Sequence, residues 1–279
     1  MVVSLLCAAG SALTYGTSTL MQAVATRRAH GLAVVLTPLA VGAFVLDGLG
    51  FLLSLLALQS LPLFVVQSVM ASMLVVVVLG ARLVLHVRLR RLDVVAVVVV
   101  VAALVLIGLG SGEQPAVEPP ASFTAAMLIA TGALAVVALA LYASGPGWAL
   151  AVVAGLGFSV AAIAARASHH HDGLAATLWQ PMTACLVVGG LIGALGYLRS
   201  LERIAVGPGA AILSVIEVVV PGTIGVLVLG DGVANGMLPG VAVGLVLAVG
   251  GCVVLALSPA NRAAEGEPSP GAAQAAGAG

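Results

Sequence analysis

Nine long apolar stretches make up nearly all of this 279-residue chain, and its charged residues lie mostly in the gaps between them. The chain is 62% hydrophobic and 7% charged, whereas a soluble domain averages about 25% charged residues. A membrane span needs about 20 predominantly apolar residues. The pattern therefore predicts an all-α, polytopic membrane helix bundle of about nine transmembrane helices. We place the spans near residues 2–25, 32–57, 62–85, 93–111, 123–143, 148–166, 174–198, 206–230 and 233–257.

The positions of the Arg residues predict the orientation of the chain. All ten formal positive charges are Arg, and with nine spans Arg166 alone falls on the side opposite to the other nine. Cytoplasmic gaps carry the excess of basic residues. We therefore expect a cytoplasmic-membrane protein with its N-terminus outside and its C-terminus in the cytoplasm. The absence of Lys is typical of a GC-rich bacterial genome. Asp231 lies in an outer gap, on the same side as Arg166.

One internal gap differs from the rest in composition. The segment 112–122 is rich in Pro and acidic residues, which indicates an extended linker. It divides the chain into a first repeat of four helices, residues 1–111, and a second repeat of five helices, residues 123–258. The tail, residues 259–279, is rich in Ala, Gly and Pro and is predicted to be disordered and cytoplasmic.

A short internal similarity supports two related halves. Gln67 lies 13 residues before Gly80, and Glu217 lies 13 residues before Gly230, and both runs end in Val-Leu-Gly. The two spans run in opposite directions across the membrane. Inverted repeats of this kind are typical of transporters whose binding site lies near the midplane between the repeats.

Two carboxylates, Asp47 and Glu217, lie near the middle of apolar stretches, with no Arg or Lys predicted beside them. A charge at the bilayer centre costs roughly 2.5–3.5 kcal/mol on insertion scales. Each acid is therefore either protonated and hydrogen-bonded to the backbone, or available to a proton or a cation. Ionisable residues at this depth are functional by default. Gly48 and Gly50 leave room for another backbone or a hydrated ion near Asp47.

Further polar residues within the spans could line a polar path together with these two acids. Ser11, Thr14, Ser18 and Gln22 form one stripe at helical spacing in the first span. Pro221 follows Glu217 and should free backbone carbonyl groups there. The candidate substrate- or ion-binding residues are Asp47, Glu217, Gln67, Gln180, Ser214, Thr14 and Ser18, and the candidate metal ligands are Asp47 and Glu217. The alternative for the uncharged residues is packing: hydroxyl groups bond their own helix, and Gln67 and Gln180 bridge helices.

Other chemistries find little support in the sequence. The run from His169 to Asp172 has no further His or Cys in its gap, so it indicates a solvated loop, with a weak metal site or pH sensor as the alternative. No Ser/His/Asp set, nucleotide motif or basic nucleic-acid patch is present. We expect no enzyme activity, no cofactor and no nucleic-acid partner. The expected partners are the lipid bilayer, a small-molecule or cation substrate, and a second copy of the chain in a homodimer.

The stretch from Gly42 to Gly80 resembles the drug/metabolite transporter superfamily, which includes the EamA-like permeases. Residues 57–67, Ala-Leu-Gln-Ser-Leu-Pro-Leu-Phe-Val-Val-Gln, are similar to the segment that joins two core helices in that superfamily. Residues 216–221, Ile-Glu-Val-Val-Val-Pro, and Leu-Gly-Asp at 229–231 are similar to its penultimate span. The resemblance implies ten spans in two inverted halves, here lacking the first helix.

A nine-span chain with an outer N-terminus is similar to the NIPA-type magnesium transporters. Residues 46–51, Leu-Asp-Gly-Leu-Gly-Phe, stand where that branch has an acid followed four residues later by Phe. Gln67 and Arg82 depart from the pattern, since a Pro and a Glu are usual there. The resemblance implies a secondary transporter, with Mg²⁺ as one cargo. The alternatives are a proton-coupled exporter of an amine-bearing metabolite or drug, and a non-transporting membrane scaffold.

Overall fold

The computed structural model describes residues 2–28, 37–84, 86–110, 121–168 and 180–264, and every regular element in these ranges is a helix. The predicted all-α fold class is confirmed. The helices are α1 (Val2–Arg28), α2 (Pro38–Leu58), α3 (Leu63–Ala71), α4 (Met73–Val84), α5 (Arg91–Gly110), α6 (Ala121–Ser144), α7 (Gly147–Ala167), α9 (Pro181–Leu201), α10 (Val206–Leu227), α11 (Leu238–Ala256) and α12 (Pro259–Ala264).

Eight helices in the described part of the chain are long and apolar enough to cross a membrane. They are α2, the pair α3–α4 taken as one, α5, α6, α7, α9, α10 and α11. The helix α1 has 27 residues, but its Ser, Thr and Gln side chains lower its hydropathy and it is not among the eight. It nevertheless runs through the bundle beside α2 and α4. The protein is thus a polytopic membrane helix bundle.

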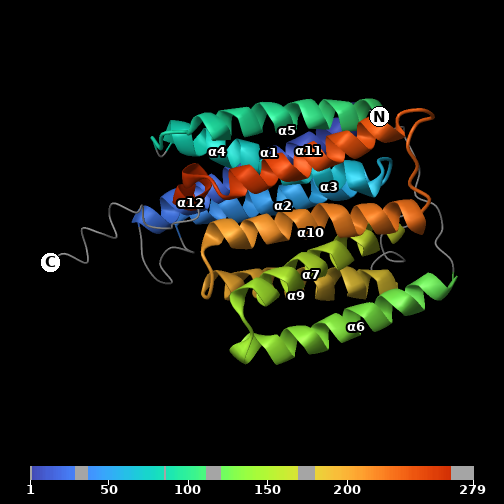
Figure 1. The fold of residues 1–279 in the computed structure, drawn as a ribbon. Helices are drawn as coiled ribbons and strands as arrows, with labels where there is room; N and C mark the ends of the chain where they lie inside the picture. Colours follow the sequence, from blue (N-terminus) through green and yellow to red (C-terminus); the bar gives the residue numbers. More distant parts are fainter. Residues whose placement is uncertain (1, 29–36, 85, 111–120, 169–179, 265–279) are drawn as a thin grey trace.

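The long helices lie roughly alongside one another, and the chain passes back and forth along the bundle (Figure 1). The helix α1 begins at one end of the bundle and α12 lies at the opposite end (Figure 1). The helices α5 and α6 lie at opposite margins and expose many apolar side chains, such as Val98, Val105, Ile129 and Leu139. In a bilayer these side chains contact lipid.

The packing of the first half of the chain reappears in the second half. The helix α1 packs along α2 as α7 packs along α9, and α1 contacts α4 as α7 contacts α10. Between the halves, α3 packs against α10 and α5 against α11. The helix α6, which packs on α7 and α9, is the additional helix of the second half. The described helices therefore make matching sets of contacts before and after residue 120.

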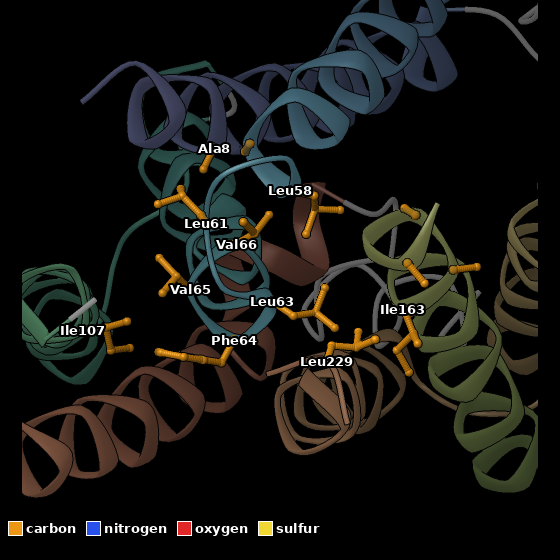
Figure 2. Close-up of a cluster of buried hydrophobic side chains, with 14 of the residues drawn as sticks. Ala8, Leu58, Leu61, Leu63, Phe64, Val65, Val66, Ile107, Ile163 and Leu229 are labelled. Carbon is orange, nitrogen blue, oxygen red and sulfur yellow. The ribbon is translucent and has the colours of Figure 1, made fainter. Parts of the chain in front are cut away.

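The turn between α2 and α3 lies in the larger of two buried apolar clusters (Figure 2). Its Leu61 and Leu63 are fully buried. Ile107 of α5 lies on one side of this turn, and Ile163 of α7 and Leu229 lie on the other (Figure 2). Helices from both halves thus pack around the short connection between α2 and α3.

Pro and hydroxyl residues set several helix boundaries. Pro38 occupies the first position of α2, and the side chain of Thr37 caps that helix. The predicted stretch 62–85 is divided into α3 and α4 at Ser72, whose hydroxyl group donates to the carbonyl oxygen of Val69 at 2.5 Å. Such back-bonding competes with the regular backbone hydrogen bonds of a helix. The third span is therefore interrupted rather than continuous.

Two predicted segment boundaries need correction. The tail predicted to be disordered over 259–279 begins with the helix α12, because Ala260, Asn261 and Ala264 are buried and α12 packs against α4. The predicted linker 112–122 ends earlier than expected, since α6 begins at Ala121. The rest of that linker and of the tail lies outside the described residues, as does the run from His169 to Asp172.

Candidate functional site

The polar stripe of α1 faces α2. The hydroxyl group of Ser11 donates to the carbonyl oxygen of Gly50 at 2.8 Å, and that of Ser18 donates to the carbonyl oxygen of Ala43 at 2.9 Å. The two helices approach closely at Gly50, where a Cβ atom would lie 2.6 Å from Oγ1 of Thr14. Thr14 itself donates to carbonyl groups of its own helix. Much of this stripe therefore fastens α1 to α2.

Asp47 lies on the same interface, near the middle of α2, and is partly buried. The side-chain amide of Gln22 donates to Oδ2 of Asp47 at 3.0 Å and to the hydroxyl oxygen of Ser18 at 3.0 Å. No Arg pairs with this carboxylate among the described residues. A Cβ atom added at Gly48 would meet nothing within 4 Å, so the backbone beside Asp47 is open on that side.

Glu217 lies near the middle of α10 and is partly buried. Its carboxyl group makes no hydrogen bond or ion pair with another described residue. The helix continues through Pro221, which has no amide hydrogen to give to the backbone carbonyl group of Glu217 four residues earlier. Ser214, one turn before Glu217, is buried in α10. Glu217 thus carries both a side-chain carboxyl group and a backbone carbonyl group that lacks its usual helical donor.

Tyr15 also lies on the interface between α1 and α2, although the sequence did not single it out. It lies near the middle of α1 and faces α2, since a Cβ atom at Gly50 would lie 3.2 Å from two carbon atoms of its ring. The usable signal was that Tyr15 is the single aromatic residue of α1 and adjoins the polar stripe. Tyr15 therefore adds an aromatic side chain to the interface between α1 and α2 that holds Asp47.

The two predicted Gln residues make no hydrogen bond to Asp47 or Glu217 in the described part of the chain. Gln67 is buried in α3, and none of the described hydrogen bonds links it to either acid. Gln180 precedes α9 and donates to the carbonyl oxygen of Ser168 at 3.3 Å, just beyond the end of α7. The level of Glu217 along α7 is marked by Ser159, which contacts the neighbouring residue Ile216. Ser168, the partner of Gln180, lies nine residues further along the chain, which corresponds to roughly 13 Å along a helix. Gln180 therefore bridges helices at an end of the bundle.

A buried ion pair at that same end was also missed. Nη2 of Arg166 lies 2.9 Å from Oδ1 of Asp231, and the two side chains are 1% and 0% exposed. From the sequence, Arg166 was predicted to be the single outer Arg and Asp231 an acid of an outer gap. The sequence did contain an indication of this pairing, because both residues were predicted at the ends of spans on the same side of the membrane.

The ion pair reaches the turn between α2 and α3. Arg166 donates through Nη1 to the carbonyl oxygen of Leu58 at 2.6 Å, and Asp231 accepts from the backbone amide of Leu63 at 2.6 Å. Gly225 makes room, because a Cβ atom there would lie 2.5 Å from Oδ2 of Asp231. A single network therefore joins α2, α3, α7 and the loop after α10.

The metal-binding capacity of the described residues is small. No group of three or more His, Cys, Asp or Glu side chains is placed to hold a metal ion within these residues. Asp47 and Glu217 supply two carboxylates on different helices.

No family model, curated protein or solved structure matches the chain. The class of protein therefore follows from the fold, which is an all-helical, polytopic membrane bundle. The family stays a prediction from the sequence resemblance.

The bond from Ser18 to α2 gives a stability prediction. Ser18→Ala removes the donor to Ala43 and the acceptor for Gln22, and we expect the free energy of unfolding to fall by about 0.6 kcal/mol, and at most about 1.7 kcal/mol. Unfolding in mixed micelles with increasing dodecyl sulfate would measure this change. Thr17→Ala is the control, since Thr17 is exposed on the same helix. Its replacement should leave the dodecyl sulfate concentration at the midpoint of unfolding unchanged. Equal effects of the two variants would contradict the assigned role of Ser18.

Proposed function

We propose that this protein is a secondary transporter that moves a small cation across the membrane through a site formed by Asp47, Glu217 and Tyr15. The observation that carries the proposal is that each half of the chain places one acid near the middle of a long apolar helix, Asp47 in α2 and Glu217 in α10. Neither acid has an Arg partner among the described residues. A carboxylate at this depth that is not neutralised by the protein is suited to bind a proton or a cation from outside.

The proposed mechanism is a rocking motion of two inverted halves around this site. Asp47 belongs to the first half and Glu217 to the second, so a relative rotation changes the separation of the two carboxylates. The matching contacts of α1–α2 with α7–α9, and of α1–α4 with α7–α10, support such related halves. The resemblance to the drug/metabolite transporter superfamily supports the same arrangement. Transporters built from repeats alternate access by moving one repeat against the other.

The chemistry of the site favours Mg²⁺ as the first cargo to test. Mg²⁺ retains several waters and is commonly bound through one or two carboxylates. Asp47 and Glu217 supply these carboxylates, and the backbone carbonyl group of Glu217 is a further oxygen without its usual helical donor. The second candidate is an organic amine exchanged for protons, and Tyr15 favours it because an aromatic ring on the interface that holds Asp47 can help to stabilise an ammonium group.

The proposed orientation follows from the distribution of Arg residues. We place the N-terminus outside and the C-terminus in the cytoplasm of a bacterial cytoplasmic membrane. In this orientation the network of Arg166 and Asp231 lies at the outer end of the bundle. The connection between α6 and α7 and the end of α9 lie at the cytoplasmic end.

The decisive test is Mg²⁺ flux into proteoliposomes that contain the purified protein. We expect Asp47→Asn and Glu217→Gln each to reduce flux to the level of protein-free liposomes, because an amide keeps the size of the side chain but cannot hold the charge of a cation. Glu265→Gln, outside the apolar stretches, is the matched carboxyl-to-amide control and should transport like the wild type.

The outcomes separate the alternatives. Wild-type protein that is folded and inserted but carries no Mg²⁺ would exclude that cargo. An amine flux that follows an imposed pH gradient and is lost in both variants would then assign the site to an organic cation. If neither type of cation moves, and both acids can be neutralised without loss of stability, the protein is a scaffold rather than a transporter.

A further inference from the structure

An apolar groove lies between α6, α7 and α9, away from the carboxylates. Its volume is about 200 Å³, and the side chains that line it are apolar apart from the hydroxyl group of Tyr142. Leu139 of α6 and Leu191 and Leu195 of α9 line the groove and are more than half exposed. A groove with these walls, on the lipid-facing margin of a membrane bundle, fits a hydrocarbon chain.

Two Arg residues stand at one end of this groove. The guanidinium carbon of Arg199 lies 5.3 Å from the centre of the Tyr142 ring, and its Nε donates to the carbonyl oxygen of Tyr142 at 3.1 Å. Arg203 donates through Nη2 to the carbonyl oxygens of Tyr142 at 3.1 Å and Ala143 at 2.7 Å, and through Nη1 to that of Gly145. These bonds hold both guanidinium groups at the C-terminal end of α6, beside the groove.

Both guanidinium groups keep donors that no bond within the described residues uses. Arg199 Nη2 and Arg203 Nε make no hydrogen bond there, although Arg199 also pairs through Nη1 with Glu202. Two Arg against one Glu leave a positive surplus. Trp148, in the first turn of α7, is 60% exposed at the same end. Exposed Trp and Tyr residues mark the level of lipid headgroups.

We propose that Arg199 and Arg203 bind the phosphate group of an anionic phospholipid whose acyl chain lies in the groove between α6, α7 and α9. Basic pockets between transmembrane helices on the cytoplasmic side recognise anionic headgroups. The apolar walls, the two remaining guanidinium donors and the flanking aromatic rings meet at one end of α6. This site is independent of the acids Asp47 and Glu217, so it stands whether or not the chain transports a cation.

The test compares phosphatidylglycerol with phosphatidylcholine of the same acyl chains, titrated into the purified full-length protein and counted by native mass spectrometry. The wild type should bind the anionic lipid about tenfold more tightly or better, because each Arg near the membrane surface strengthens binding of an anionic lipid severalfold. Arg199→Gln/Arg203→Gln should reduce the preference to about twofold or less. Arg199→Lys/Arg203→Lys, which retains both charges, should keep most of it.

Matched variants separate this site from general charge effects. Arg82→Gln/Arg91→Gln removes two exposed Arg residues from the ends of α4 and α5 and should leave the preference unchanged. Ala138→Phe fills the groove without touching a charge and should weaken the binding of both lipids. Glycerol phosphate, which has the headgroup chemistry without acyl chains, should not compete.

Several results would overturn the proposal. They are equal affinity of the wild type for both lipids, loss of the preference in Arg82→Gln/Arg91→Gln, unchanged binding in Ala138→Phe, and full competition by glycerol phosphate. The last result would indicate a site for free phosphate compounds. If Arg199→Gln/Arg203→Gln does not fold, because Arg203 also bonds to the end of α6, the Lys pair and Ala138→Phe still decide the question.

Discussion

Asp231→Ala is expected to lower the free energy of unfolding by about 3–5 kcal/mol, the cost of breaking a buried ion pair from one side. The Asp231 carboxylate accepts from Nη2 of Arg166 at 2.9 Å and from the backbone amide of Leu63 at 2.6 Å, with no exposure of its side chain. The variant leaves a buried guanidinium group without its carboxylate and a helix start without its acceptor. The loss should exceed that of a typical surface ion pair, which contributes about 0–1 kcal/mol.

Unfolding in mixed micelles measures the loss, and the double variant Arg166→Gln/Asp231→Asn separates charge from hydrogen bonding. In the double variant the Asn oxygen can still accept from the amide of Leu63, and the Gln amide can still donate to Leu58. We expect it to be more stable than Asp231→Ala. Asn235→Ala, an exposed position in the same loop, is the control. Unchanged stability of Asp231→Ala would show that the pair contributes nothing to the fold.

The spans and their order follow from the sequence because the bilayer imposes a length and a composition on each segment that crosses it. The apolar run from 93 to 111 became α5, and the run from 123 to 143 became α6, within a few residues. The interruption at Ser72 was not predicted, since a hydroxyl group that bonds its own helix is compatible with an unbroken span. The helix α12 was not predicted because its buried Asn261 depends on packing against other helices.

The acids themselves could be predicted, but their partners could not. Asp47 and Glu217 are conspicuous because few acids occur deep in apolar stretches. Tyr15 and Arg166 are ordinary residues until the fold brings Tyr15 to the interface of α1 and α2 and Arg166 to Asp231. A positive-inside count treats Arg166 as a loop charge, whereas burial beside Asp231 places it inside the bundle. Pairings of this kind depend on which helices are neighbours, and periodicity in one helix does not contain that information.

The contact between α7 and α9 gives the second large effect. Gly189→Ala should destabilise the protein by about 1–3 kcal/mol, the usual cost of overfilling a packed interface. A Cβ atom at Gly189 would lie 2.8 Å from the carbonyl oxygen of Gly157 and 3.0 Å from the amide nitrogen of Ala161. Both are backbone atoms, so they cannot turn aside as a side chain would. The helices must separate, and small residues are what allow such close approach in membranes.

The neighbouring residue supplies the control for this prediction. A Cβ atom at Gly190 would meet nothing within 4 Å, so Gly190→Ala should retain stability or gain up to about 1 kcal/mol from the higher helix propensity of Ala. The two variants make the same chemical change at adjacent positions of one helix, and their opposite signs in a dodecyl sulfate titration would isolate the clash. Equal stability of Gly189→Ala and Gly190→Ala would mean that α7 and α9 do not pack through Gly189, and that the second half of the bundle is held together by other contacts.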